Sequence, residues 1–215
     1  MYLSPSELTN EFDRQINNLL QKKYPDTANL SQDAFLKYIE PLRLKLSDIS
    51  VHEKDLNKGK LPFVIVVSNE LIPSEKMMML VERESRNGVT ILRPHTSKNF
   101  KTIVGVSIPD KNIYLLVDID RGKENINLPP NEAMKLIAKE QRSPLTIDEG
   151  IAIVTQYPQF LMKNNCYSLL ASRTGTDQRV PAIWINSKKE PNLGWCWDGN
   201  PHTWLGSASC VMRIG

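Results

Sequence analysis

The chain has 215 residues, of which 40% are hydrophobic and 24% are charged, and its formal net charge is +3 at pH 7. This length fits one domain, or one domain with a small helical appendage, and is enough to bury a core. A weak net charge without a dense basic run argues against a nucleic-acid-binding protein, so we expect no nucleic-acid partner.

The apolar residues are distributed in short stretches. The longest, Phe63 to Val67, has the size of a strand and not of a membrane span, so we expect no membrane partner. The first residues are polar and helical in pattern, which predicts that no signal peptide is present. The three cysteines, Cys166, Cys196 and Cys210, cannot all pair within one chain. An odd number without a secretory signal is typical of reduced thiols, so we predict a cytoplasmic protein.

Residues 1–46 predict an amphipathic helical hairpin. Ser4 and Glu7 have the spacing of a capping box, and apolar residues then recur at helical spacing for about five turns. A second helical pattern begins at Ser31, and Pro41 is expected to end or kink it. Such a hairpin must bury its apolar side against another part of the chain.

A polar stretch over residues 47–60 is expected to link the hairpin to an α+β domain over residues 61–215, the two together forming one structural unit. Phe63 to Val67 is a β-branched run, which predicts a strand buried on both faces. Ile113 to Ile119 predicts a second strand. Two helices are expected to follow, one opened by Pro130 and one by a capping box of Thr146 and Glu149.

The last third of the chain predicts antiparallel strands, over Cys166–Ser172, Val180–Asn186 and Leu193–Trp197. Helices come first and strands later, with little βα alternation between them. We therefore predict an α+β fold, in which the N-terminal helical hairpin packs on a mixed, largely antiparallel sheet.

The segment from Gly194 to Gly206, here called the tryptophan motif, holds three of the four tryptophans. If it begins as a strand, Trp195 and Trp197 share one face and Cys196 lies on the other. The residues that follow have turn chemistry, because Asp and Asn bond their own backbone and Gly tolerates a positive φ. The motif thus predicts a stiff loop that displays polar side chains beside indole rings, as a small polar pocket requires.

The first functional hypothesis is a binding pocket at this loop for a small polar metabolite or a peptide end. Arg173 and Arg179 flank the connection between the first two of the three predicted antiparallel strands, and the pair could hold a carboxylate or phosphate with paired hydrogen bonds. The candidate ligand contacts are Trp195, Trp197, Asn200, Thr203, Trp204, Arg173 and Arg179.

The second hypothesis is a hydrolase or transferase with His202 as general base and Asp198 behind it. Cys196 is a weaker nucleophile candidate, since it should point away from a pocket walled by the neighbouring indoles. In the third hypothesis the tryptophans are simply core, because buried aromatics usually are, and the protein is structural or binds a protein partner.

No cofactor or metal is expected. The chain has neither a Gly-rich phosphate loop nor the spacing of a structural zinc site. Met77, Met78 and Met79 lack a nearby His or Cys, so core packing is the favoured interpretation. Asp118 and Asp120 alternate at a strand end and could bind a divalent cation, but closing the strand beside a glycine turn is favoured.

Several blocks of the sequence resemble an uncharacterised family of bacterial proteins, a domain of unknown function. The resemblance covers nearly the whole chain and is most specific in the tryptophan motif, Gly-Trp-Cys-Trp-x-Gly-Asn-Pro-His-Thr-Trp-Leu-Gly. It implies a cytoplasmic bacterial protein and a single unit, but no reaction and no catalytic residue. The other blocks are Glu11–Gln15, Leu61–Val64, Tyr114–Asp118, Pro144–Thr146 and Glu149–Ala152.

Overall fold

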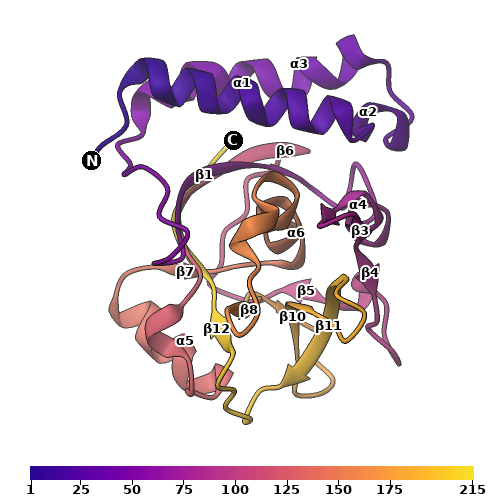
Figure 1. Ribbon diagram of the computed structural model, residues 1–215, viewed down its shortest axis with the longest axis vertical. Coiled ribbons are helices and arrows are strands. Elements are labelled where there is room, and N and C mark those ends of the chain that lie inside the picture. Colours follow the sequence, from indigo (N-terminus) through magenta and orange to yellow (C-terminus); the bar gives the residue numbers. More distant parts are fainter.

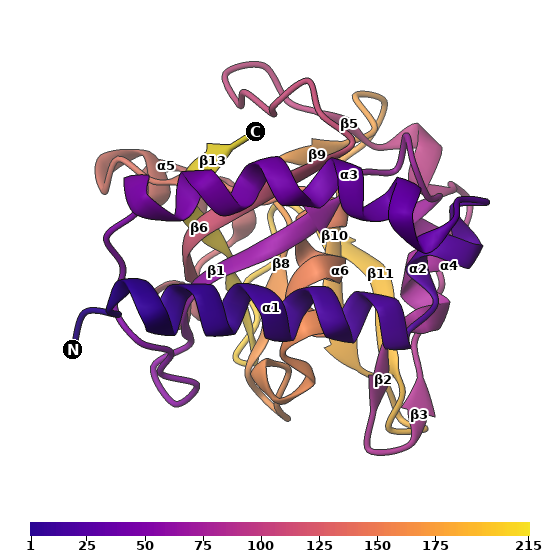
Figure 2. The same cartoon turned by 90° about the horizontal axis from the view of Figure 1, so that it is seen from above.

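The computed structural model describes all residues from Met1 to Gly215. Two long helices, α1 (Pro5–Gln21) and α3 (Gln32–Arg43), lie side by side over one face of a sheet that contains β1 (Lys60–Val67) and β6 (Ile113–Asp120) (Figures 1 and 2). Helix α6 (Ile147–Gln156) lies beneath that sheet, and a second sheet lies beyond α6 (Figure 1). The predicted α+β class, with a helical hairpin on a largely antiparallel sheet, is confirmed.

The helical hairpin forms for the reasons that its sequence indicates. Ser4 caps α1, and Glu7 completes the capping box. Lys23 has a positive φ of 59°, which ends α1 before the short helix α2 (Tyr24–Thr27). Ser31 caps α3, but Pro41 does not end it, because it lies in the last turn and the helix continues to Arg43. A 3-10 helix, η1 (Leu44–Asp48), then begins the connection that the sequence predicted to be a loop.

The first sheet has the antiparallel order β1-β6-β13-β7, with β13 (Ser209–Ile214) and β7 (Ser143–Pro144). Strand β1 is buried on both faces, as predicted, and its outer edge meets α1. Gln15, which has no exposed surface, donates to the carbonyl of Phe63 (3.0 Å) and accepts from the N–H of Ile65 (2.8 Å). One side-chain amide therefore satisfies the strand edge that would otherwise be left without partners.

The second sheet has the order β12-β8-β10-β11-β4. Its three central strands are antiparallel, and the two outer strands pair in parallel with their neighbours. The remaining strands are two residues long and form two further antiparallel pairs. The bounds are β12 (Leu205–Ser207), β8 (Cys166–Ser168), β10 (Arg179–Ile185), β11 (Pro191–Trp197), β4 (Val89–Thr90), β2 (Glu82–Arg83), β3 (Arg86–Asn87), β5 (Lys101–Thr102), β9 (Ser172–Arg173), α4 (Ser74–Leu80), α5 (Pro130–Lys139), η2 (Ser97–Asn99), η3 (Lys123–Asn125) and η4 (Pro158–Phe160).

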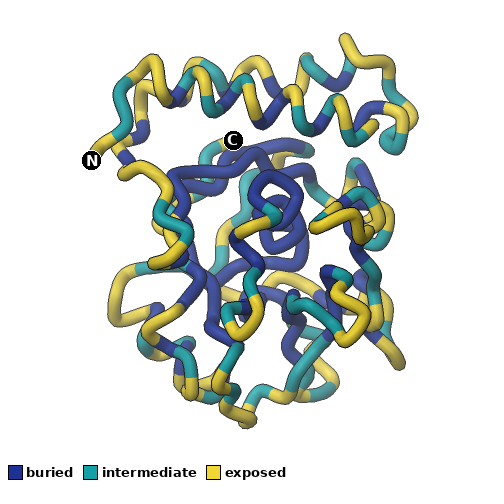
Figure 3. The backbone as a smooth tube through the Cα atoms, in the orientation of Figure 1, coloured by how far each residue is buried: buried dark blue, intermediate teal, exposed yellow.

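One hydrophobic core of 47 buried residues takes side chains from the hairpin, from both sheets and from α6 (Figure 3). Every residue of α6 is buried, since it is enclosed between the two sheets. Of the three consecutive methionines, Met77 and Met78 lie in this core, whereas Met79 is 65% exposed. No helix combines the length and the apolar composition needed to cross a bilayer.

Candidate functional site

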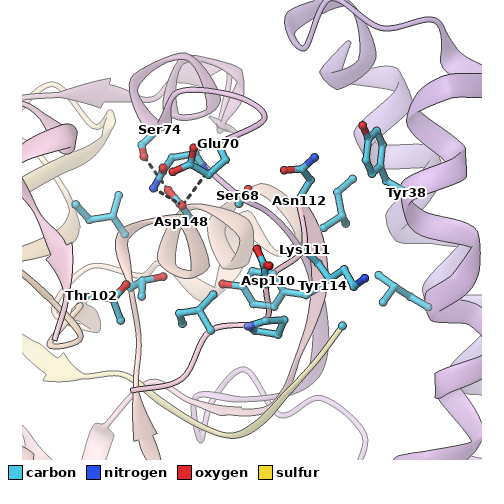
Figure 4. A pocket seen from close by; sticks show the side chains of 18 of the residues that line it. Tyr38, Ser68, Glu70, Ser74, Thr102, Asp110, Lys111, Asn112, Tyr114 and Asp148 are labelled. Atoms are coloured by element: carbon cyan, nitrogen blue, oxygen red, sulfur yellow. Dashed lines mark hydrogen bonds between the residues drawn. The ribbon is translucent and has the colours of Figure 1, made fainter. Parts of the chain in front are cut away.

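Two clefts of similar volume, about 750 and 720 Å³, open on the surface. The first, here called the main cleft, is lined by 24 residues, only 7 of which are hydrophobic. It lies between α3, the turn after β1, the loop that leads into β6, and the N-terminus of α6 (Figure 4). These four segments are far apart in sequence, and the layered fold brings them together. The cleft is therefore a polar hollow between the helical hairpin and the body of the protein.

Asp148 forms the floor of this cleft, in the first turn of α6, and is only 7% exposed. Its carboxylate accepts hydrogen bonds from the Ser74 hydroxyl (2.7 Å) and from both the backbone N–H and the side-chain amide of Asn69 (2.9 and 2.8 Å). Burial raises the pKa of Asp148 to about 6, although these hydrogen bonds act in the opposite direction. No positively charged side chain pairs with it.

The adjacent carboxylate, Glu149, has a different environment. It is fully buried and forms an ion pair with Arg213 through both of its oxygens. It also accepts from the Tyr114 hydroxyl (3.0 Å) and from the N–H of Thr146 (2.7 Å), which completes the predicted capping box. The α6 N-terminus thus carries two neighbouring carboxylates, of which one has a counter-charge and the other does not.

The rim of the cleft carries five further charged residues, all exposed. Lys37 lies on α3 and Lys45 on its 3-10 extension, and both line the cleft. Glu70 follows β1, and Asp110 and Lys111 precede β6. None of the five belongs to any of the ion pairs of the molecule.

The tryptophan motif lies elsewhere, on the second sheet. Trp195 and Trp197 share one face, as predicted, with ring centroids 5.0 Å apart. The guanidinium of Arg179 lies over both rings, 4.3 and 4.8 Å from their centroids. Cys196 points to the opposite side and packs against a small apolar cluster beneath α5. Burial raises the pKa of its thiol, which makes it a poor nucleophile.

Two glycines of the motif are required by close contacts. A Cβ atom on Gly194 would lie 2.1 Å from the indole of Trp184. A Cβ atom on Gly206 would lie 2.4 Å from the carbonyl oxygen of Gly122. Gly199, in contrast, has no atom within 4 Å of the corresponding position. Part of the motif therefore serves the packing of the second sheet.

The proposed dyad of His202 and Asp198 is not assembled. The Asp198 carboxylate accepts a hydrogen bond from Arg173 (3.0 Å), and no hydrogen bond joins it to His202. The Nε2 atom of His202 is buried without a partner beside the ring of Trp204, 5.3 Å away between centroids. Burial lowers the pKa of His202, which favours the neutral imidazole. Asp198 pairs with Arg173 and not with His202, because a hydrogen bond from a charged guanidinium to a carboxylate is stronger than one from a neutral imidazole.

The two arginines do not form a free anion-binding pair, because each is held by its own carboxylate. Arg173 pairs with Asp198, and Arg179 pairs with Asp177. Asp177 also bonds the Nε2 atom of His95 (2.7 Å), a partner 82 positions away in sequence. Although burial acts to raise the pKa of Asp177, the hydrogen bonds from these neighbours lower it below its usual range.

Two other proposed contacts, Asn200 and Thr203, are exposed, and their side chains make no hydrogen bond. No residue from Trp195 to Trp204 lines the main cleft, so the expected pocket and the main cleft are different places. The three cysteines are unpaired, and no group of three or more His, Cys, Asp or Glu side chains is placed to hold a metal ion. Asp118 and Asp120 instead form ion pairs with basic side chains, those of Arg142 and Lys60.

Glu149 is recognisable in the sequence as part of a helix cap, whereas no local pattern selects Asp148. Acidic residues in the first turn of a helix are common, because they interact favourably with the helix dipole. The available signal was that two acids stand together at the start of an otherwise apolar helix, where only one is needed for the capping box.

The fold and the site define an α+β protein with a polar cleft between a helical hairpin and its sheet. A model described as a family of unknown function (DUF5701) matches residues 18–215, so the chain belongs to that family. No curated protein and no solved structure matches the chain.

Proposed function

We propose that this protein binds a small polar molecule in the main cleft, with Asp148 as the anchoring group. The observation that carries this proposal is the buried Asp148 carboxylate, which opens on a polar cleft and has no counter-charge in the protein. The volume of about 750 Å³ lies within the range of small-molecule sites.

The energetics of burial support the same site. A carboxylate removed from water is costly unless it is paired and hydrogen-bonded. Asn69 and Ser74 donate three hydrogen bonds to the Asp148 carboxylate but bring no positive charge. A ligand with hydrogen-bond donors or a positive charge would therefore compensate the buried carboxylate further. Ser68, on the wall of the same cleft, has a buried hydroxyl with no partner and offers a further contact.

The tryptophan motif is the second candidate site, on one specific observation. The Nε2 atom of His202 is buried and without a partner beside the indole ring of Trp204, so it could bond to a ligand at the loop. His202 is less suited to act as a general base, because the Asp198 carboxylate forms an ion pair with Arg173. A site at this loop would use Trp204 and Asn200 as ligand contacts.

We also propose that the protein is cytoplasmic. The three free cysteines, two of them fully enclosed in the core, support a reducing compartment.

A thermal-shift screen against polar metabolites and divalent metals tests the proposed site, because a ligand of the native state raises its stability. The screen compares the wild type with Asp148→Asn, His202→Ala and Asp33→Asn. Asp33 is an exposed residue of α3 that makes no side-chain hydrogen bond, so its variant is the matched control for loss of one carboxylate.

We expect a compound that stabilises the wild type, the control and His202→Ala, but not Asp148→Asn. A compound whose effect is lost only in His202→Ala would move the site to the tryptophan motif. If no compound distinguishes the folded Asp148→Asn variant from the control, the proposed function is wrong.

A further inference from the structure

The charged groups of the cleft are sorted in space. Figure 4 places Glu70 beside Asp148 and Ser74 at one end of the cleft, whereas Lys111 extends toward α3 at the other. The α3 side contributes two more cations, Lys37 and Lys45. Asp110, next to Lys111 in the sequence, lies between these two groups (Figure 4). The cleft therefore has an acidic end at the α6 N-terminus, and its three lysines lie toward the helical hairpin.

The six charged residues balance, with three lysines (Lys37, Lys45 and Lys111) against three carboxylates (Glu70, Asp110 and Asp148). None of them forms an ion pair. A ligand of one sign would meet repulsion at one end, because it would bring its charge close to like charges in a partly enclosed space.

We propose that the ligand is a small amphoteric molecule, an amino acid or a short peptide. Its ammonium group bonds to the Asp148 carboxylate, and its carboxylate lies beneath α3 between the lysines. This inference rests on the proposed function and specifies the ligand class of the same site. Asn69 and Ser74, which also line the cleft, fix the orientation of the Asp148 carboxylate through their hydrogen bonds, so it presents an oriented acceptor to the ammonium group.

Two other ligand classes fit the cleft less well. A phosphate at the α6 N-terminus would compete with Asp148 and Glu149, which already occupy the first turn with negative charge. A metal ion would need more donors than Asp148 alone, and no cluster of three acidic, His or Cys side chains is present.

The test is a calorimetric titration of the wild type with the standard L-amino acids and glycylglycine. Each probe that binds is compared with its N-acetylated form and its C-terminal amide. The same probes are titrated into Asp148→Asn and Lys111→Gln, with Asp33→Asn and Lys139→Gln as matched controls, since Lys139 is exposed and unpaired on α5.

For a probe that binds, we expect N-acetylation or Asp148→Asn to weaken binding by about tenfold or more, because each removes one side of a buried charged contact. Lys111→Gln should weaken binding by about two- to fivefold, and should have no further effect on the amide form of the probe.

The inference is overturned if the N-acetylated probe binds as tightly as the free one, or if no probe of the panel binds. Amide NMR spectra then separate the two levels of the proposal. A ligand without an amine that shifts the amide signals of Asn69 and Asp148 would refute the amphoteric class and leave the binding cleft intact. If no compound of any class shifts those signals, both proposals fail.

Discussion

The ion pair between Glu149 and Arg213 gives a strong test of how the core is held together. Glu149 is fully buried, the Arg213 side chain is 5% exposed, and two hydrogen bonds join them. The Arg213→Met variant keeps much of the side-chain volume but leaves Glu149 in the core without its counter-charge. Breaking one partner of a buried pair costs about 3–5 kcal/mol, so we expect the free energy of unfolding to fall by that amount.

Urea denaturation of the variant, followed by circular dichroism, measures this loss. The double variant Glu149→Gln with Arg213→Met removes both charges, while the glutamine can still accept from the N–H of Thr146. We expect it to be more stable than Arg213→Met alone, since no uncompensated charge remains. If Arg213→Met loses less than about 1 kcal/mol, the description of Glu149 as a buried, paired carboxylate is wrong.

Three further predictions concern single positions. Gly194→Ala should lower the free energy of unfolding by about 1–3 kcal/mol, because its Cβ would overlap the neighbouring indole. Gly199→Ala should be nearly neutral in the same denaturation assay. Equal losses in the two variants would show that close packing does not require Gly194. Gln15→Leu should cost at least about 2 kcal/mol because it leaves the β1 edge without partners, and the exposed Gln21→Leu should not; a stable Gln15→Leu would refute the role of that amide. Because the pKa of Asp148 is raised in the folded state, its carboxyl holds a proton that the unfolded chain releases between about pH 4 and pH 6, so the contribution of Asp148 to stability should fall as pH rises through that window. Asp148→Asn should remove this fall, which is on the order of 3 kcal/mol, and identical pH profiles of the two proteins would show that the carboxyl is not perturbed.

Local patterns in the sequence predict local structure well in this protein. The capping residues Ser4 and Thr146 begin α1 and α6 in the structure as they do in the pattern, because a cap depends on residues within one turn. The alternation of Trp195, Cys196 and Trp197 likewise follows from the period of a strand.

Contacts between distant segments could not be predicted in the same way. The dyad of His202 and Asp198 was inferred from closeness in sequence, but Arg173, 25 positions earlier, takes the carboxylate. The last strand, β13, was missed, because its exposed and buried residues do not alternate regularly. The cleft was missed as a whole, since α3 and α6 meet there only after the hairpin packs on the sheet, and no single stretch carries its signature.

The most direct test of the central claim is a set of amide NMR spectra recorded while the stabilising compound from the screen is titrated into the protein. We expect the signals of Asn69, Ser74 and Asp148 to shift together and saturate, and the Asp148→Asn variant not to respond at the same concentrations. Shifts confined to residues 195–204, with the signals around Asp148 unchanged, would contradict it and assign the ligand to the tryptophan motif.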